Sequence, residues 1–557
     1  MREFFRLISN INELCGRRKP LAKYLLLGIF FAFFDLFALY LLGKFFSSAF
    51  SSGESQEVIW VQLDFSDLAI AVICIYIFRL IIGVGFLRGV NRLSARIESD
   101  LKVKLLKSYQ ELEYEFRLKK GVGELADAIN NWTSSFARSV VSPLVRFTCE
   151  SVVSLTIFGY FCYLYPRVTF LVLGLAILVV MIYDISLKNR INKYANEFRR
   201  LSSQVANEVQ DGLVGYKEIY TFNLTDFFLE KIKKNSEKMC FALAGANLLS
   251  QVPRLIIEAF LVVVTITILW FSVFSGGNFL IELPGVAVLG VGLMRIASWF
   301  SLATSTLSNL RVYRPIVHAI QKDINSNKSE ILSDAIQNNH YKKMIGLTVE
   351  DLCVGYGSDK SVFYNMSFHF GVGDKVLLWG PSGSGKTTLI DTLFGLIKPR
   401  SGRVVVKFDD GSTSSSLLGL GCYISQNTFI INDTLRRNVA LGVSDLNIDD
   451  SKIIKCLTRA RLLDYASVEK LDMSLGDSGA RLSGGQRQRV VIARALYLSM
   501  AVLIVDEATS GIDEPTESEI ISDMLNLDGD VTLILVSHRP NVAEKFSRKI
   551  DISNFVS

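Results

Sequence analysis

Residues 380–387 read Gly-Pro-Ser-Gly-Ser-Gly-Lys-Thr, and this octet decides the fold of the C-terminal part of the chain. It matches the phosphate-loop pattern Gly-x4-Gly-Lys-[Ser/Thr], in which glycines let successive backbone N–H groups turn toward phosphate oxygens. Residues 374–379 before it form an apolar strand pattern, and residues 388–395 after it form an amphipathic helix pattern. This order places the positive N-terminal end of a helix against the phosphates. The alternative, a chance octet in a flexible loop, does not account for the strand and the helix.

The octet predicts a site for ATP and Mg²⁺. Lys386 is expected to reach the β- and γ-phosphates, and the Thr387 hydroxyl is expected to ligate Mg²⁺. The expected nucleotide contacts of this loop are Gly380, Pro381, Ser382, Gly383, Ser384, Gly385, Lys386, Thr387 and Thr388.

Two adjacent carboxylates follow another apolar run. Residues 501–505 have a buried-strand pattern that ends in Asp506 and Glu507. In a phosphate-loop enzyme the first carboxylate holds Mg²⁺ through water, and the second polarises the attacking water. Asp506 is therefore a predicted metal residue, and Glu507 is the candidate general base. The two residues could instead cap a helix, but their combination with Lys386 favours the catalytic interpretation.

His538 ends a further apolar strand pattern, Leu535-Val-Ser-His-Arg539. A lone histidine more often has a structural role. Ligands of parallel sheets bind at the C-terminal ends of the strands, however, and this position favours contact with the γ-phosphate side of the site. We therefore include His538 among the catalytic candidates.

Composition places the rest of the chain in a membrane. Of the 557 residues, 50% are hydrophobic and only 20% are charged, and the mean hydropathy is +0.33. A soluble enzyme rarely has this composition. The eight cysteines are scattered without a C-x-x-C pair or a histidine cluster, which argues against a disulfide framework and a zinc site. The net charge of +6 is modest, and no aromatic-basic pattern indicates nucleic-acid binding.

Six apolar segments of about twenty residues, the length that crosses a bilayer core, begin near Leu21, Leu68, Val145, Val168, Pro253 and Pro284. Basic residues before the first segment place the N-terminus in the cytoplasm, and residues 1–20 have the pattern of an interfacial helix. The N-terminus lacks a small-residue cleavage site, so we expect the first segment to stay in the mature protein. An even number of crossings returns the chain to the side where ATP is. We predict a transmembrane domain with cytoplasmic helical extensions at 1–320, a linker at 321–344 and a nucleotide-binding domain at 345–557.

The most specific motif is Leu482-Ser-Gly-Gly-Gln486, in which a turn at a helix N-terminus offers a hydroxyl and bare N–H groups to an anion. With this motif the whole chain resembles a half-size ATP-binding cassette (ABC) exporter. The resemblance implies a multi-pass α-helical membrane domain of the type I (type IV) exporter fold, with six transmembrane helices, fused to an α/β P-loop nucleotide-binding domain. It also implies a homodimer, in which the signature of one subunit contacts the γ-phosphate of ATP held by the other. The residues involved are Ser483, Gly484, Gly485 and Gln486.

The resemblance assigns further residues. Tyr356 resembles the aromatic residue that stacks on adenine, and Gln426 resembles the lid glutamine that senses Mg²⁺ and contacts the membrane domain. Because the catalytic motifs are intact, the resemblance implies a hydrolysing site and membrane helices that alternate between inward-facing and outward-facing states. Segments 121–131 and 215–228 are the expected coupling helices. The chain ends soon after His538, so we expect the terminal helices usual in this domain to be missing.

Charged residues inside the apolar segments bear on the substrate. Each costs about 2.5 to 3.5 kcal/mol at the centre of a membrane helix. They could be structural, with Asp35 paired to Arg79 and Arg254 paired to Glu258, or they could contact the substrate. Their placement is similar to that in bacterial flippases for lipid-linked oligosaccharides, and this similarity implies that basic residues meet the pyrophosphate head of the lipid. The charged residues are Asp35, Arg79, Glu150, Arg254, Glu258 and Arg295, of which Arg79, Arg254, Arg295 and Asp35 are the substrate candidates.

The sequence leaves three functions open. Flipping of a lipid-linked oligosaccharide across the bacterial inner membrane is the first. A multidrug, peptide or lipid exporter of the same fold is the second, and stimulation of ATP hydrolysis by drugs or apolar peptides would favour it. A non-transporting ATP-gated channel or sensor is the third, and the intact Glu507 argues against it.

Overall fold

The computed structural model of the chain consists of two compact units. The first comprises residues Met1–Gln110 and Lys120–Ser326, and the second comprises Glu111–Lys119 and Asn327–Ser557. The residues that the structure describes are 18–50, 56–58, 61–112, 114, 120–164, 166–274, 279–325, 343–355, 362–381, 383–425, 428–506, 514–526 and 531–555.

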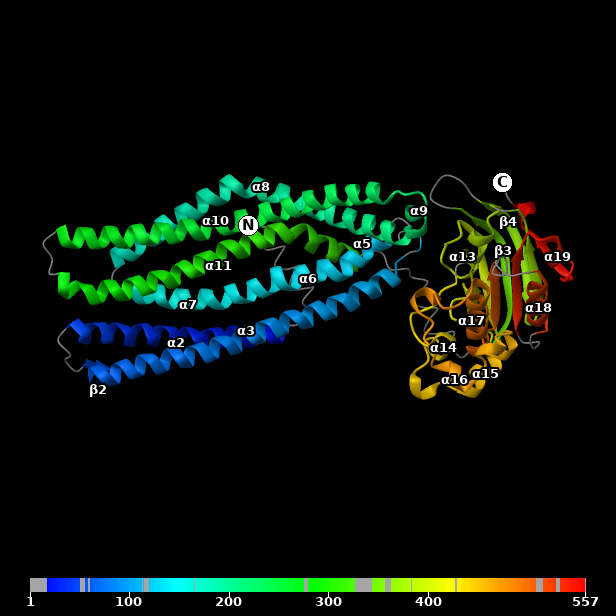
Figure 1. Cartoon of the computed structure of the whole chain (residues 1–557), viewed down its shortest axis with the longest axis horizontal. Helices are drawn as coiled ribbons and strands as arrows, with labels where there is room; N and C mark the ends of the chain where they lie inside the picture. Colours follow the sequence, from blue (N-terminus) through cyan, green and yellow to red (C-terminus); the bar gives the residue numbers. More distant parts are fainter. Residues whose placement is uncertain are drawn as a thin grey trace. The chain divides into compact units, whose positions relative to one another are not determined.

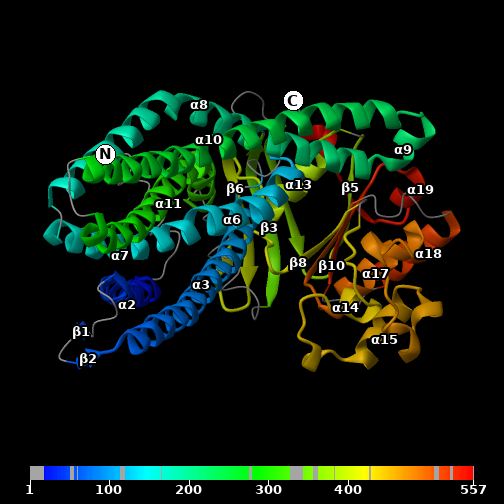
Figure 2. The same ribbon diagram turned by 60° about the vertical axis from the view of Figure 1, so that its left-hand side comes forward.

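The first unit is a bundle of long helices that run side by side (Figures 1 and 2). Helix α2 packs against α3 and α7, and α10 packs against α8 and α11. Two π-helical turns, Ala128–Trp132 and Phe136–Val141, join α5, α6 and α7 into one continuous helical segment. The elements are α2 (Arg18–Phe50), β1 (Gln56–Val58), β2 (Val61–Leu63), α3 (Phe65–Gln110), α5 (Val122–Asp127), α6 (Thr133–Ser135), α7 (Ser142–Leu164), α8 (Pro166–Val214), α9 (Tyr216–Thr221), α10 (Thr225–Phe274) and α11 (Phe279–Asn325).

Three helical segments of the described residues are long and apolar enough to cross a membrane, namely Gly28–Ala49, Phe65–Gln110 and Val122–Tyr163. The other three predicted crossings fall in α8, α10 and α11, where the structure leaves many side chains undescribed. The number of six crossings therefore stays a prediction. The predicted interfacial helix of residues 1–20 lies almost entirely outside the described residues.

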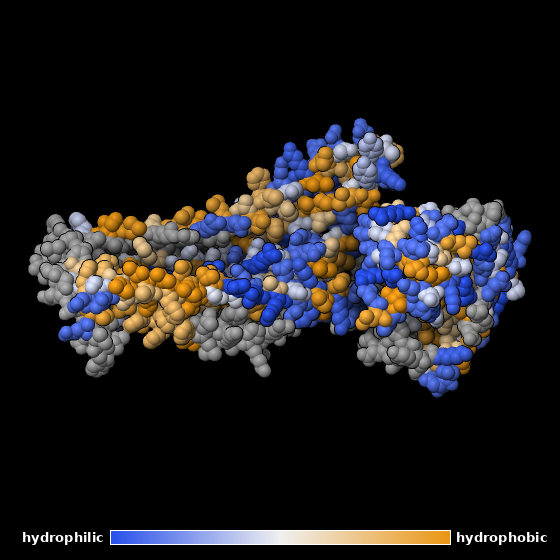
Figure 3. Space-filling model, turned by 60° about the horizontal axis from the view of Figure 1, so that its bottom comes forward, coloured by the Kyte–Doolittle hydropathy of each residue, from blue (hydrophilic) through white to orange (hydrophobic). Residues whose placement is uncertain are grey.

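The outer surface of α3 changes character along the helix. Ile70, Ile77 and Val84 are exposed apolar side chains, whereas Arg88 and Arg92 are exposed charged ones further along. Figure 3 shows apolar side chains covering one stretch of the long helices and polar ones covering another. Because a bilayer core accepts only the apolar stretch, α3 fits a helix that leaves the membrane and continues into water.

The second unit contains two sheets. The five-stranded sheet has the order β11-β5-β10-β9-β8, and all of its pairs are parallel. The four-stranded sheet has the order β4-β3-β6-β7, and all of its pairs are antiparallel. The strands are β3 (Met344–Val354), β4 (Phe363–Gly371), β5 (Lys375–Trp379), β6 (Ser401–Phe408), β7 (Thr413–Ser414), β8 (Gly421–Ile424), β9 (Val502–Asp506), β10 (Thr532–Ser537) and β11 (Arg548–Asp551).

The parallel sheet is buried on both faces, which explains the continuous apolar runs of its strands. Along β10, Leu533 and Leu535 pack into a core with α15, α17 and α18, whereas Ile534 and Val536 pack into a core with α13 and the antiparallel sheet. Figure 2 shows α14, α15 and α17 together beside this sheet. The helices are α13 (Lys386–Leu393), α14 (Leu435–Val439), α15 (Asp450–Arg459), α16 (Val468–Leu471), α17 (Gly484–Tyr497), α18 (Glu514–Leu525) and α19 (Pro540–Ala543).

A buried carboxylate fixes the end of α11 in the first unit. Asp323 accepts hydrogen bonds from the Tyr109 hydroxyl at 2.7 Å and from Lys120 Nζ at 2.8 Å. Its backbone carbonyl accepts a third from Ser108 Oγ at 2.6 Å. Tyr109 and Lys120 flank the segment Glu111–Lys119, which groups with the second unit. The segment Glu111–Lys119 lies outside both predicted coupling segments, 121–131 and 215–228.

We expect Asp323→Asn to destabilise the first unit. The substitution removes the charge that pairs with Lys120 while it keeps the size of the side chain, and a buried charge-assisted interaction contributes about 1.5–3 kcal/mol. The apparent melting temperature of the detergent-purified protein should fall by several degrees, whereas the exposed Asp226→Asn should leave it unchanged. Equal melting temperatures of both variants and the native protein would contradict a stabilising role of the Asp323 charge.

Candidate functional site

The phosphate loop runs from the end of β5 into α13, as the sequence predicts. Gly383 and Gly385 have φ angles of 84° and 86°, which side chains other than glycine rarely adopt. A Cβ on Gly385 would lie 2.5 Å from Phe363 Cζ, and one on Gly380 would lie 2.7 Å from Ser384 Oγ. Glycine is therefore required here both for the turn and for the space.

Two side chains of the loop present polar atoms to its interior. Lys386 is only 7% exposed, and its Nζ donates to the carbonyls of Gly380 and Pro381, both at 2.9 Å. Ser384 Oγ is buried and has no hydrogen-bond partner within the described part of the chain. Such a hydroxyl is costly unless something accepts from it or donates to it. A buried ammonium group and an unsatisfied hydroxyl fit a phosphate group.

Asp506 ends β9 at the same sheet edge. Asp506 lies opposite Val536 of the parallel neighbour β10. The Tyr423 hydroxyl donates to Asp506 Oδ2 at 2.9 Å. Thr387 is the second residue of α13, and its side chain is exposed. A carboxylate and a hydroxyl are hard oxygen donors of the kind that Mg²⁺ takes together with nucleotide phosphates. The donor set therefore fits the metal that the sequence predicts.

His538 follows directly after β10. Ser537 pairs with Trp379, the last residue of β5, so His538 and Gly380 are the next residues at the same edge of the sheet. The histidine is exposed. Four other predicted site residues, Tyr356, Ser382, Gln426 and Glu507, lie outside the described residues.

The signature turn begins α17. Ser483 is its N-cap, with its Oγ accepting from Gln486 N at 3.2 Å while Gln486 Oε1 accepts from Ser483 N at 2.9 Å. This capping box ties the two side chains to backbone N–H groups, and the N–H groups of Gly484 and Gly485 have no acceptor within the turn of the helix itself. Ser483 and Gly484 are exposed. The start of α17 is therefore exposed, and an exposed helix N-terminus favours anions.

A buried arginine that the sequence analysis does not single out braces this helix. Arg494 of α17 donates to the carbonyls of Asn438 at 2.8 Å and Phe429 at 2.9 Å. Asn438 is fully buried and exchanges hydrogen bonds with the backbone of Ile431 at 3.0 Å in both directions. The sequence feature that indicates a buried arginine is its place within the apolar run Val490-Val-Ile-Ala-Arg-Ala495. Arg494 connects α17 to the loop that follows Gln426.

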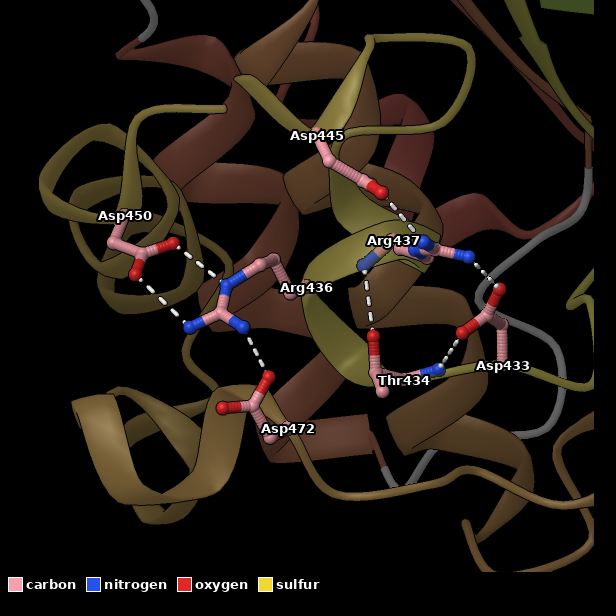
Figure 4. Close-up of polar contacts among 7 residues, drawn as sticks. All are labelled: Asp433, Thr434, Arg436, Arg437, Asp445, Asp450 and Asp472. Carbon is pink, nitrogen blue, oxygen red and sulfur yellow. Dashed lines mark hydrogen bonds and ion pairs between the residues drawn. The ribbon is translucent and has the colours of Figure 1, made fainter. Parts of the chain in front are cut away.

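Two neighbouring arginines of α14 hold the surrounding helices (Figure 4). The Arg436 guanidinium is bidentate to Asp450, with N–O distances of 2.8 and 3.0 Å, and also pairs with Asp472. On the other side Arg437 pairs with Asp433 at 3.2 Å and Asp445 at 2.6 Å. Bidentate pairs add geometric definition as well as energy. They fix α14 against α15 and α16 in the part of the unit that carries the signature turn.

A second polar site lies among the helices of the first unit. Asp35 is 3% exposed and pairs with Arg79, which confirms the structural pairing predicted for these two residues. Arg295 lies 3.9 Å from the same carboxylate. Arg254 lies in α10, and its side chain is not among those that the structure describes. Its pairing with Glu258 therefore stays a prediction.

A cavity of about 260 Å³ adjoins this ion pair. Arg79, Arg146 and Glu150 supply its polar lining, and Phe31, Leu80 and Val84 are among its apolar lining residues. Arg146 is exposed and Glu150 is partly exposed. Sequence reasoning missed Arg146, which stands at the start of the apolar run that forms α7.

Comparison with known proteins places the chain in a family. Residues 363–510 match the family model described as ABC transporter, and residues 21–283 match the one described as ABC transporter transmembrane region. The chain belongs to the ABC transporter family. It combines one membrane region and one nucleotide-binding domain, which makes it a half-transporter of the exporter type that hydrolyses ATP.

Several relatives have curated names. An ATP-dependent lipid A-core flippase of Ralstonia nicotianae is 37% identical over 209 residues, which are 36% of this chain and 35% of that protein. A protein of the same name from Desulfotalea psychrophila is 25% identical over 88% of this chain and 85% of its own. The heterocyst differentiation ATP-binding protein HepA of Nostoc sp. is 27% identical over 66% of this chain and 60% of its own.

The structure of a bacterial Atm1-family ABC exporter with ATP bound superposes with a TM-score of 0.78 at 20% identity. The match covers 96% of this chain and 94% of that one. The exporter fold thus extends over both units. The family assignment makes the chain a multi-pass membrane protein that binds ATP and drives export with it.

One buried carboxyl near the site generates a pH prediction. Asp391 of α13 is 5% exposed, and burial together with the charge of Asp506 raises its pKa from 3.8 to about 6. The protonated form is favoured in the folded state, so the stability it contributes is lost as the pH rises from below 3.8 through 6. Each pKa unit corresponds to about 1.4 kcal/mol.

We therefore expect Asp391→Asn to stabilise the nucleotide-free protein. The gain in melting temperature over the native protein should increase from pH 4.5 to about pH 6.5 and then level off, because the native carboxylate is fully charged there. The exposed Asp464→Asn serves as the surface control. A gain that did not change between pH 4.5 and pH 7.5 would show that Asp391 is not disfavoured as a carboxylate.

Proposed function

We propose that the chain acts as a homodimer that flips a lipid-linked oligosaccharide across the bacterial inner membrane by alternating access driven by ATP hydrolysis. The observation that carries the substrate assignment is the arginine-rich cluster in the membrane unit. The cavity beside Asp35 and Arg79 is lined by both charged and apolar side chains. An amphipathic lipid has a polar head group and apolar chains that match these two kinds of lining.

The dimer follows from the two halves of the nucleotide site. The phosphate loop presents Lys386 and Ser384 to a phosphate, and the signature presents Ser483 and the N–H groups of α17 to an anion. Each chain has one copy of each motif. In a homodimer the signature of one subunit would close over ATP held by the loop of the other, giving two sites per dimer.

The proposed roles within each site follow the chemistry of the residues. Lys386 would bind the β- and γ-phosphates, and Thr387 and Asp506, with Gln426, would hold Mg²⁺. The bound metal would neutralise charge that develops on the phosphate oxygens. Glu507 would polarise the attacking water, His538 would contact the γ-phosphate and Tyr356 would stack on adenine. The loop residues from Gly380 to Thr388 would supply the remaining contacts.

The charge balance of the membrane cluster favours an anionic head group. Three arginines, Arg79, Arg146 and Arg295, surround two carboxylates, Asp35 and Glu150, which leaves an excess of one positive charge (3 − 2 = 1). An excess charge on membrane helices is costly unless an anion or water compensates it. A pyrophosphate group would do so, and guanidinium groups can bind its oxygens in pairs. Arg254 is the further candidate from α10.

The names of the relatives support a second candidate substrate. Two of them are called ATP-dependent lipid A-core flippase, and such a glycolipid also joins apolar chains to a polar head. We place the lipid-linked oligosaccharide first because the placement of Asp35, Arg79, Arg254 and Arg295 is similar to that in its flippases. We also propose a cytoplasmic N-terminus and nucleotide-binding domain, with segments 121–131 and 215–228 as coupling helices.

Reconstitution in liposomes tests the proposal. A fluorescent polyprenyl-pyrophosphate oligosaccharide should become inaccessible to a quencher on one leaflet when ATP and Mg²⁺ are added. Glu507→Gln should abolish this movement, because a mutation of the base stops turnover. Movement of a lipid A-type glycolipid alone, or efflux of drugs alone, would replace the proposed substrate, and ATP hydrolysis without any movement would support a channel or sensor.

A charge-balanced pair of substitutions separates structural from substrate roles of the arginines. We expect Asp35→Asn combined with Arg79→Gln to keep the folded dimer, since it removes both partners of the ion pair, but to lower glycolipid flipping by about tenfold or more. Arg88→Gln, on the exposed surface of α3, is the matched control and should flip normally. Native flipping rates in the double variant would show that Arg79 only neutralises Asp35.

A further inference from the structure

Tyr423 lies between the phosphate-loop helix and the strand that ends in Asp506. It sits on β8 opposite Ile504 of the parallel neighbour β9, two residues before Asp506. Its side chain reaches along the strand direction, and its hydroxyl donates to Asp506 Oδ2 at 2.9 Å. A residue of one strand thus orients the carboxylate that ends the next strand.

Packing fixes the position of this hydroxyl. The Tyr423 ring lies 6.2 Å from the Phe394 ring, at an interplanar angle of 54°, and Phe394 caps the C-terminal end of α13. Tyr423 is half-buried and packs, with Tyr114, against the core that holds the parallel sheet to α13. A phenol held by its ring has two torsion angles and little freedom, so the hydrogen bond fixes Asp506 in turn.

The Tyr423 hydroxyl is a neutral donor, and the packing of its ring holds it in place. Because the phenol is neutral, it leaves the full negative charge on the carboxylate while it fixes the position of Oδ2.

We propose that Tyr423 is a positioning residue for Mg²⁺, which acts by orienting Asp506 toward the metal that accompanies ATP. The inference rests on the proposed role of Asp506 and is independent of the lipid substrate. Groups that orient a metal-binding carboxylate typically change metal affinity by about tenfold or more. A merely structural tyrosine would affect folding and leave the metal contribution to nucleotide binding unchanged.

Nucleotide binding with and without metal tests this role. The full-length protein in detergent, with Glu507→Gln to prevent hydrolysis, is titrated with fluorescent ATP in EDTA and in Mg²⁺. We expect Tyr423→Phe to bind ATP in EDTA within about twofold of the parent, and to lose about tenfold of the affinity gained on adding Mg²⁺.

Two further variants make the result decisive. Tyr497→Phe removes another hydroxyl of the same unit, which accepts from Asp449 N at 3.0 Å, and it should keep the full Mg²⁺ gain. Asp506→Asn should lose the gain. If Asp506→Asn loses it while Tyr423→Phe keeps it, the inference about Tyr423 is overturned. If Asp506→Asn also keeps it, the proposed role of Asp506 is wrong, and the role of Tyr423 falls with it.

Discussion

Enclosure of a phosphate by backbone N–H groups is the constraint on which the second unit depends. The chain meets it with left-handed glycines at Gly383 and Gly385, between a strand buried on both faces and a helix that begins at Lys386. The loop can present only part of such an enclosure, and the signature turn at Ser483 presents another part on the surface of the same chain. Two copies arranged head to tail would complete both sites, which is why nucleotide binding and assembly are one event in the proposed mechanism.

A second constraint acts in the membrane unit, where charges in apolar surroundings must be compensated. The pairing of Asp35 with Arg79 satisfies part of it, and Arg295 lies close to the same carboxylate. The remaining positive excess is the feature on which the proposed substrate role of this cluster rests. A substrate that carries negative charge into it would stabilise the bundle, and ATP-driven movement of the helices would change how well the cluster accommodates that charge. In the proposed mechanism the same residues serve stability and transport, and charge-balanced substitutions are needed to separate the two roles.

Sequence patterns predicted those parts of the structure that depend on local order. The strand, loop and helix around residues 380–387, the strand before Asp506 and the pairing of Asp35 with Arg79 follow from short runs and from charge. The hydrogen bond from Tyr423 to Asp506 could not be predicted in this way, because it depends on β8 and β9 being neighbours and on their register. Arg494 and Asp323 are similar cases, since each joins backbone or side chains far apart in sequence. The number of crossings and the roles of Glu507 and Gln426 stay predictions.

In the proposed mechanism, ATP brings the nucleotide-binding domains of the two subunits together, and a spin-label distance measurement can detect this approach. Leu446 is 97% exposed in the second unit, so a label on Leu446→Cys, after replacement of the native cysteines, reports the distance between the two subunits. With Glu507→Gln, we expect ATP and Mg²⁺ to convert a long, broad distance distribution into a shorter, narrow one. The same distribution with and without ATP, in protein that binds ATP, would contradict it.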